Sequence, residues 1–447
     1  MKSTFDLQNP WRTPGYQFPR DRYIERDIFT KLMEEQEKKR ITVVLGSRQV
    51  GKTFLMGKII EKLLSEKNID PKQIFYFNFD AFNLIDLVEN DREFFDFIGS
   101  YGLANKRSYI FFDEAQRITE VGVLIKRYYD LGLEIKFTVS GSSSLQIKSQ
   151  VKETLTGRKQ LFELPPISYL EFLRYKGLET SVDLTQLVRF ESDKYQRLME
   201  EFVIFGGYPG VVVTEDTDAK ISLLKEIYHS YIQKDISDFL KVEDIAGFNR
   251  LVQFLAAQTG SLCKINEVSK NIRVSRHFVE KYLFALEQTY VLSFLRPYFT
   301  NLGKAIIKTP KLYFCDTGLR NTVFGTFQRL KKRPDTGVII ENFVFSELIK
   351  SIEKDRLWFY RTTTGSEIDF LFIRGRHVIP VEVKYSTSRQ GVIPKTFDTI
   401  KGQTGFMKAL VITKDYLEKR EKANAQINFR PAWSIFNMGD EFAGELS

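Results

Sequence analysis

The sequence predicts an α/β protein: a P-loop parallel-sheet core, then a helical lid, a winged helix-turn-helix and a second α/β domain. In the first third of the chain, short apolar runs alternate with amphipathic helical patterns, which is typical of βαβ units. A glycine-rich motif follows the first apolar run and precedes a helix, where P-loops occur. Downstream, helical periodicity gives way to one helix and three apolar runs, which predicts a second α/β region.

Apolar runs in the first third predict buried strands, and amphipathic runs predict crossover helices at 54–66 and 120–131. The strands are expected at Ile41–Leu45, Ile74–Phe79, Tyr109–Phe112, Ile135–Val139 and Leu161–Leu164. The domain boundaries that follow are 1–166 for the core, 167–240 for the lid, 241–303 for the winged helix, 304–337 for a basic linker and 338–447 for the C-terminal domain.

The winged helix-turn-helix is predicted from the order of elements after residue 244. A helix at Phe248–Gln258 precedes a shorter helical pattern near Asn266–Asn271 and a three-residue turn. Ser275 is then placed to cap a longer amphipathic helix, and Tyr290–Leu295 follows as a strand. This order matches a winged helix-turn-helix.

Composition excludes several classes of protein. The 447 residues are 43% hydrophobic and 14% aromatic, which is enough to bury several cores. The longest uncharged runs, such as Phe202–Thr214, fall short of the roughly 20 residues of a membrane helix. Two cysteines, Cys263 and Cys315, are too few for a disulfide framework or a four-cysteine zinc site. The start of the chain carries no apolar stretch, so we expect a cytoplasmic protein without a membrane partner.

The first candidate site is a phosphate cradle that fits G-x-x-x-x-G-K-[ST]. Its residues are Gly46, Ser47, Arg48, Gln49, Val50, Gly51, Lys52 and Thr53. The glycines let backbone N–H groups curl around a phosphate, and the following helix N-terminus favours negative charge. Lys52 is expected to reach the β- and γ-phosphates of ATP, and the Thr53 hydroxyl to bind Mg²⁺.

A second element supports nucleotide hydrolysis. The apolar run Tyr109–Phe112 ends in two acids, Asp113 and Glu114. An aspartate at this strand end holds Mg²⁺ in P-loop ATPases, so Asp113 is the expected metal ligand. Glu114 can polarise a water for attack on the γ-phosphate. The pair favours an ATPase over a small-molecule kinase.

Two further residues are candidates in the same region. The strand Ile135–Val139 leads into a serine-rich run, in which Ser142 is our choice for sensing the γ-phosphate; a serine-rich turn is the alternative. Arg158 follows Thr156 and Gly157 and could reach the phosphate of a neighbouring subunit in a homo-oligomer as an arginine finger. It could equally be a surface arginine.

An ordered set of motifs runs along the chain: GSRQVGKT, FFDEAQ, SGSSS, LTGR, PPISYLEF, FGGYPGVV, QKDI, ENFVFSEL, FYRTTTGSEIDFLF and VIPVEVK. The set resembles the prokaryotic AAA-type ATPases that carry a C-terminal domain of unknown function. The resemblance covers nearly the whole chain. It implies an AAA-like core, a winged helix and a restriction-endonuclease-like α/β domain, without implying a settled biological role.

The C-terminal region contains a second candidate site. Glu341, Asp369, Glu382 and Lys384 resemble the PD-(D/E)XK nuclease constellation. In that constellation acids bind Mg²⁺, here Asp369 and Glu382, and a lysine orients or activates the attacking water. In the family fold a helix, here Ile339–Ile352, supplies one acid, which would be Glu341.

The spacing of these residues has a geometric consequence. If Ile368–Ile373 and Val378–Lys384 form a hairpin with a two-residue loop at Gly375-Arg376, Asp369 faces Glu382. Residues two apart share a face of a sheet, so Lys384 joins them. The alternative is a nuclease-like fold kept for packing or binding, with its acids paired to Lys384 and Arg361.

The net charge of +9 is concentrated in one region. The segment Lys264–Pro334 holds 14 Lys and Arg against 4 Asp and Glu, a net charge of +10. Its long helix is expected to expose basic residues to a DNA groove. The residues are Arg273 in the turn and Arg276, His277 and Lys281 on the helix, together with Glu280. The alternative is an ATPase lid or a protein-docking surface.

The sequence therefore predicts a Mg²⁺-dependent ATPase that acts as a nucleotide-driven switch on DNA, with cleavage by the C-terminal domain left open. The alternative is an ATP-gated regulatory or protein-docking module whose nuclease-like domain is inactive.

Overall fold

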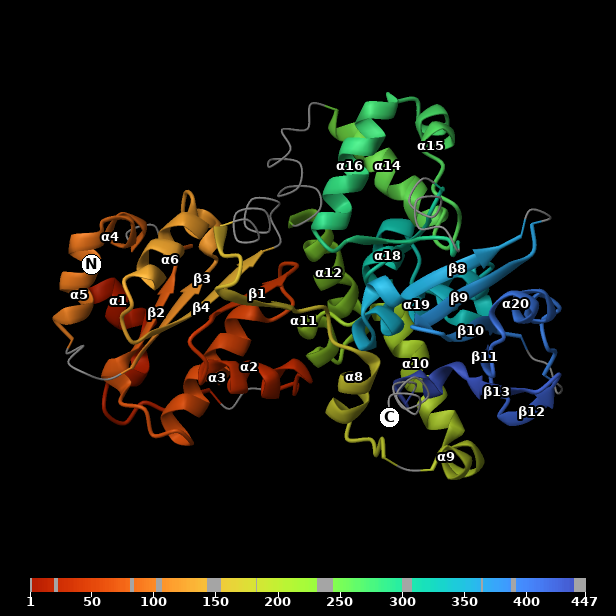
Figure 1. Cartoon of the computed structure of the whole chain (residues 1–447), viewed down its shortest axis with the longest axis horizontal. Coiled ribbons are helices and arrows are strands. Elements are labelled where there is room, and N and C mark those ends of the chain that lie inside the picture. Colours follow the sequence, from red (N-terminus) through yellow and green to blue (C-terminus); the bar gives the residue numbers. More distant parts are fainter. Residues whose placement is uncertain are drawn as a thin grey trace. The chain divides into compact units, whose positions relative to one another are not determined.

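The computed structural model describes residues 2–19, 23–80, 84–101, 107–142, 154–181, 183–230, 244–299, 308–362, 365–386 and 391–437. The chain divides into two compact units (Figure 1). The first comprises Met1–Pro165 with Gln288–Tyr290, and the second comprises Pro166–Glu287 with Val291–Ser447. No helix in the described ranges is long and apolar enough to cross a membrane.

The first unit is built on a five-stranded sheet in the order β2-β3-β4-β1-β5, with every neighbouring pair parallel. Its strands are β1 (Ile41–Gly46), β2 (Ile74–Asn78), β3 (Ser108–Asp113), β4 (Ile135–Ser142) and β5 (Lys159–Glu163). All five predicted strands are present. The residues of β1 and β3 are buried throughout, as expected for central parallel strands covered on both faces.

Helices of the first unit connect and cover these strands. They are α1 (Lys2–Gln8), α2 (Ile28–Gln36), α3 (Lys52–Ser65), α4 (Ile85–Glu89), α5 (Asp91–Gly99) and α6 (Val121–Asp130). The predicted crossover helices correspond to α3 and α6. One core cluster joins Phe77 of β2, Phe94 of α5, Phe112 of β3 and Tyr128 of α6, which explains much of the aromatic content.

Residues before the first strand also form structure, which the sequence analysis did not predict. The Asn9 side chain, between α1 and a short turn of helix at Pro10–Arg12, bonds both backbone groups of Tyr76. Its amide donates to the Tyr76 carbonyl at 2.9 Å, and its oxygen accepts from the Tyr76 N–H at 2.8 Å. Gln8 does the same for Asn78. The N-terminal segment thus satisfies an edge strand that would otherwise be open.

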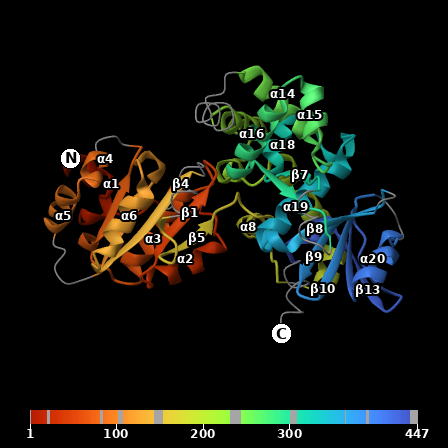
Figure 2. The ribbon, with the colours of Figure 1, turned by 45° about the horizontal axis from the view of Figure 1, so that its top comes forward.

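The second unit begins with helices and ends in a mixed sheet (Figure 2). Its helices are α8 (Tyr169–Tyr175), α9 (Leu184–Phe190), α10 (Ser192–Phe205), α11 (Pro209–Val213), α12 (Thr217–Ile227), α14 (Ile245–Ala257), α15 (Ile265–Ile272), α16 (Arg276–Gln288), α18 (Thr317–Phe324), α19 (Thr336–Ser351) and α20 (Thr396–Thr404). The predicted order of helices, turn and strand after residue 244 is present in α14, α15, α16 and β6 (Leu292–Leu295). Ser275 caps α16 as predicted, because its hydroxyl accepts a 3.0 Å bond from the N–H of Phe278.

The described part of the predicted linker at 304–337 is not a linker. Residues 308–337 contain β7 (Lys311–Phe314), which pairs antiparallel with β6, and the buried helix α18. The high density of basic residues and of Gly and Pro suggested a solvated connection. Several of the basic side chains are instead buried, including Lys311 and Arg320.

The C-terminal sheet has the order β12-β13-β11-β10-β9-β8. Its strands are β8 (Leu357–Arg361), β9 (Glu367–Arg374), β10 (His377–Lys384), β11 (Lys408–Thr413), β12 (Glu418–Lys422) and β13 (Ala425–Pro431). The predicted hairpin is confirmed, because His377 pairs with Arg374 and Val381 with Phe370. Gly375 has φ +58°, which suits the first position of its two-residue loop.

A buried ion cluster ties α14, α18 and the start of α19 together. Arg320 is 1% exposed, bonds Asp335 at 2.5 Å and also donates to the carbonyl oxygen of Ala256. Arg333 bonds both oxygens of Asp335 at 2.9 Å. Burial opposes ionisation of Asp335, but the two arginines outweigh it and lower its pKa to about 2.

We expect Asp335→Ala to lower the free energy of unfolding by about 3 kcal/mol at pH 7, because it leaves two buried guanidinium groups unpaired. A carboxyl with a lowered pKa contributes stability above its unfolded value near pH 4 and loses that contribution as the pH falls through about 2. The difference from wild type should therefore shrink below about pH 3.

Urea-induced unfolding between pH 2 and pH 7 measures this difference. The control is Asp398→Ala, which removes an aspartate from the exposed ion pair with Lys422 and should cost under about 1 kcal/mol. A loss that does not vary with pH would contradict the electrostatic explanation.

Candidate functional site

The phosphate cradle lies between the end of β1 at Gly46 and the start of α3 at Lys52. Gly51 has φ +94° and Gln49 has φ +60°, so the loop uses the left-handed conformation twice. A Cβ on Gly46 would lie 2.4 Å from the carbonyl oxygen of Leu164, so a larger residue cannot stand there. These local requirements explain the glycines of the motif.

Arg26 closes the cradle from outside the motif. Its guanidinium donates to the carbonyl oxygen of Val50 at 3.1 Å and to that of Pro165 at 2.6 Å. Val50 is buried, Arg48 is half-buried and Gln49 is exposed. Arg26 therefore ties the loop to the far end of the first unit.

Lys52 is buried inside the loop, and its Nζ donates to the carbonyl oxygens of Gly46 and Ser47 at 3.1 and 3.0 Å. Burial lowers the pKa of Lys52, whereas the charges of Glu114 and Asp113 oppose that shift. The Ser47 hydroxyl is buried without a hydrogen-bond partner in the described structure. A charged donor held only by carbonyl groups and an unsatisfied hydroxyl fit a phosphate group.

Asp113, at the end of β3, gathers the remaining polar groups of the site. The Thr53 hydroxyl donates to its Oδ2 at 2.6 Å, and the Tyr76 hydroxyl donates to the same oxygen at 2.7 Å. Its Oδ1 accepts from the Ser140 hydroxyl and, at 3.1 Å, from the Glu114 N–H. The predicted metal ligands Thr53 and Asp113 are thus adjacent, and their oxygens are of the kind that Mg²⁺ prefers.

Sequence reasoning missed Tyr76 and Ser140. Ser140 directly follows Val139, which pairs with Phe112, so the strand register places it beside Asp113. That strand register was the signal available. Tyr76 carried no signal, since its edge strand shows only apolar character. Burial, followed by the charge of Asp113, raises the pKa of Tyr76.

The other predicted residues of the first site have mixed surroundings. Ser142 pairs with Gly46 in the β1–β4 ladder, and its side chain lies outside the described structure. Glu114 follows Asp113 with φ +54° and accepts a bond from the Gln116 side chain. Arg158 forms a 2.9 Å ion pair with Asp130 of its own unit, and its role toward a neighbouring subunit stays a prediction.

In the C-terminal sheet, the predicted acids do lie together. The Asp369 N–H donates to Glu382 at 3.3 Å, and the Val383 N–H donates to Asp369 at 2.8 Å. Lys384 pairs with Glu382 at 2.6 Å. Burial raises the pKa of Asp369 and that of Glu382, because it disfavours the charged form of both carboxyl groups.

A lysine that the sequence analysis did not select completes this cluster. The Nζ of Lys311 lies 3.0 Å from Glu341, 2.5 Å from Glu367 and 3.8 Å from Asp369. Its side chain is 3% exposed. Tyr313, two residues on, donates to Glu341 at 2.6 Å. Lys311 was assigned to the linker, and nothing in its sequence neighbourhood indicates a carboxylate partner.

These contacts argue against the expected metal role of Asp369 and Glu382, which stays a prediction. A Mg²⁺ ion needs carboxylate oxygens that are free to converge on one point. Here an ammonium group lies among the acids, and within the described ranges no three His, Cys, Asp or Glu side chains are arranged to hold a metal. The residues present do not fit the ion.

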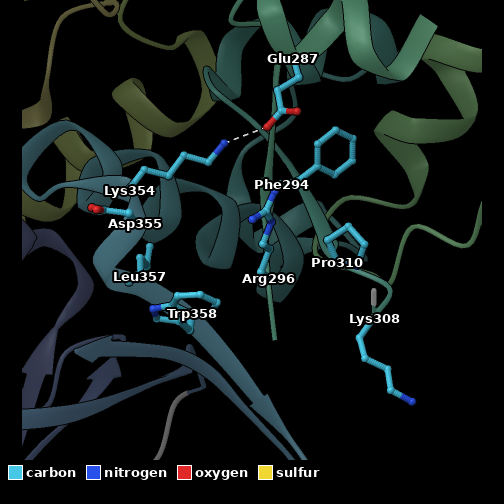
Figure 3. Close-up of a pocket in the computed structure, with 9 residues that line it drawn as sticks. All are labelled: Glu287, Phe294, Arg296, Lys308, Pro310, Lys354, Asp355, Leu357 and Trp358. Atoms are coloured by element: carbon cyan, nitrogen blue, oxygen red, sulfur yellow. Dashed lines mark hydrogen bonds and ion pairs between the residues drawn. The ribbon is translucent and has the colours of Figure 1, made fainter. Parts of the chain in front are cut away.

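A cavity of about 520 Å³ lies elsewhere in the second unit (Figure 3). It is lined by Glu287, Phe294, Arg296, Lys308, Pro310, Lys354, Asp355, Leu357 and Trp358. Lys354 pairs with Glu287 at 2.9 Å across it. No contact within the described ranges occupies the side-chain charges of Arg296 and Lys308, and both side chains are exposed.

Fold and site together define the class: the first unit is a P-loop domain of the AAA type. Residues 38–173 match the profile of the family described as AAA domain, in agreement with the P-loop and the parallel sheet of the first unit. Residues 196–330 and 336–431 match two families, each described as a domain of unknown function (DUF8612 and DUF4143).

Relatives along most of the chain are uncharacterized proteins. One from Methanocaldococcus jannaschii is 29% identical over 81% of this chain and 77% of its own length. Another from Haemophilus influenzae is 25% identical over 88% of this chain and 94% of its own length.

Among solved structures, the ORC2 protein of Aeropyrum pernix is similar over 71% of this chain and 96% of its own, with 12% identity and a TM-score of 0.40. The ORC1 protein of the same organism, solved with DNA, is similar over 70% of this chain and 95% of its own, with 13% identity and a TM-score of 0.30.

We expect Ser140→Ala to lower the rate of ATP hydrolysis about tenfold or more, because Asp113 loses a hydroxyl donor that holds its carboxylate in place. Steady-state phosphate release measures the effect. The matched control is Ser346→Ala, another buried serine, whose hydroxyl bonds the Phe343 carbonyl in α19. Equal rates in the two variants would exclude Ser140 from the site.

Proposed function

We propose that this protein is a Mg²⁺-dependent ATPase that acts as a nucleotide-driven switch on DNA. The observation that carries the proposal is the contact of Thr53 with Asp113 beside the buried ammonium group of Lys52. This is the set of groups that phosphoryl transfer by a P-loop protein needs.

Each residue of the cradle has a specific task in this proposal. Lys52 exchanges its carbonyl partners for the β- and γ-phosphates of ATP, which are better acceptors for an ammonium group. Thr53 and Asp113 would hold Mg²⁺, which supplies charge neutralisation at the phosphates. Glu114 accepts a proton from the attacking water. Arg26 keeps the loop closed while these groups act.

The DNA partner is supported by the surface of the second unit. Arg273, Arg276, His277 and Lys281 are all exposed on α16 and the turn before it. Arg276 forms an ion pair with Glu280 at 2.8 Å, which reduces the positive charge that the helix offers to a partner.

The cavity in Figure 3 adds cations without described partners beside an indole. Arg296 and Lys308 would meet phosphates, and the half-buried Trp358 would meet a base or sugar. The cavity and the basic helix are separate features of one unit, and both suit a nucleic acid.

The second candidate is an ATP-gated regulatory or docking module with an inactive nuclease-like domain. The position of Lys311 among Glu341, Glu367 and Asp369 favours the inactive C-terminal domain specifically. The geometry therefore favours a switch that binds DNA in an ATP-dependent way without cleaving it over a switch that also cleaves DNA.

Lys52→Ala should remove at least 99% of ATP hydrolysis, because the ammonium group that contacts the phosphates is lost. Phosphate release with Mg²⁺-ATP measures it, and calorimetry with a slowly hydrolysed analogue separates loss of binding from loss of turnover. Lys58→Ala, six residues further along α3 and paired with Glu61, is the control and should keep its activity. Turnover by Lys52→Ala at the wild-type rate would show that the cradle is misassigned.

Changing both Arg296 and Lys308 to Ala should weaken DNA binding and reduce the slope of log affinity against log salt by about 2, one for each lost phosphate contact. Fluorescence anisotropy with labelled duplex and single-stranded oligonucleotides measures both quantities. The charge-matched control changes Lys31 and Arg92, both exposed on the first unit. Identical salt slopes for the two double variants would remove the cavity from the DNA interface.

A further inference from the structure

Lys311 reaches the carboxylates from a rigid position. Its strand β7 is held against α19, because Asn342 accepts from the Phe314 N–H at 2.8 Å and donates to the Phe314 carbonyl at 3.0 Å. The ring of Tyr313 stacks on Phe345 with centroids 4.2 Å apart. The side chain of Lys311 is thus directed into the cluster by two packed elements rather than by a flexible loop.

Each of the three acids around Lys311 already has at least one oxygen engaged. Glu341 Oε1 accepts from both Lys311 and Tyr313. Glu367 uses Oε1 for Lys311 and Oε2 for Arg361, the latter at 3.1 Å. Asp369 Oδ2 accepts from a backbone N–H. A divalent ion at this point would have to displace the ammonium group and take over these oxygens.

The surrounding acids also favour the charged form of Lys311. Burial by itself lowers the pKa of Lys311, but the surrounding carboxylates outweigh burial and raise that pKa above its ordinary value. Lys311 therefore places a cation of the chain itself within 3.8 Å of Glu341, Glu367 and Asp369. Arg361 and Lys384 add two more at the rim of this cluster.

We propose that Lys311 is the resident cation of this cluster and closes a latent divalent-metal site formed by Glu341, Glu367 and Asp369. The wild-type chain then takes no Mg²⁺ or Mn²⁺ there, and removal of the ammonium group opens the site. This inference does not depend on whether the first unit hydrolyses ATP or on whether the second unit binds DNA.

Replacing Lys311 by Met tests this directly, because Met keeps most of the length of the side chain and removes only its charged end. The carboxylates then lose their central cation and keep only Arg361 and Lys384 at the rim as counterions. Such a group must take up a proton or bind a cation, and Mn²⁺ favours carboxylate oxygens.

The experiment titrates Mn²⁺ into the full chain without nucleotide and follows free Mn²⁺ by electron paramagnetic resonance. Lys311→Met should bind one Mn²⁺ more than wild type, at least tenfold more tightly than any binding that wild type shows. Adding Glu341→Gln to Lys311→Met should abolish this gain. Lys384→Met, which removes a cation from the exposed rim of the same cluster, should show no gain.

Several outcomes would overturn the proposal. Mn²⁺ binding by wild type that Glu341→Gln removes would show that Lys311 does not close the site. Folded Lys311→Met without a gain would show that the acids are not a metal site at all. An equal gain in Lys384→Met would mean that lost charge, rather than the vacated position, attracts the ion.

A stability measurement covers the case in which Lys311→Met is poorly folded. Its melting temperature should rise with Mn²⁺ concentration, because an ion that binds only the folded state stabilises it. The rise should exceed that of wild type, in which Mn²⁺ can stabilise only the Thr53 and Asp113 site. Absence of a rise in Lys311→Met, whatever its stability, would count against the proposal.

Discussion

A carboxylate buried at the end of a strand must be met by donors, and this constraint organises both units of the protein. Asp113 is fully buried, and its oxygens receive bonds from α3, β2, β4 and its own backbone. The parallel sheet makes this convergence unavoidable, since the carboxyl ends of its strands meet along one edge. The order β2-β3-β4 therefore decides which side chains can reach Asp113.

The second unit meets the same constraint with a charge instead of hydroxyl groups. Asp369 and Glu341 share Lys311, which comes from a strand of the preceding helical region. The difference has chemical consequences. Hydroxyl donors around Asp113 are neutral, so a metal ion can replace them without leaving an unpaired charge. An ammonium group cannot leave its carboxylates at so small a cost.

This contrast separates the two candidate sites by function. The cradle of Lys52 and Thr53 has partners that a nucleotide can exchange, as a site that cycles between bound states requires. The acids of the C-terminal sheet have a permanent counterion and are suited to fixing β7 against α19 and β9. On the proposals made above, these acids serve the architecture of the second unit, while its exposed basic groups remain available to a partner.

The sequence alone determined what depends on local order. Spacing placed Gly46, Lys52 and Thr53 at a strand-to-helix turn, and the hairpin arithmetic that set Asp369 near Glu382 holds because two-residue loops fix register. Tertiary structure decided what depends on distant pairing. Ser140, Tyr76 and Lys311 acquire their roles only from neighbouring strands, and Lys311 lies 30 residues from Glu341. A basic residue in a Gly- and Pro-rich stretch gives no sign of burial, because the charges that compensate it come from elsewhere in the chain.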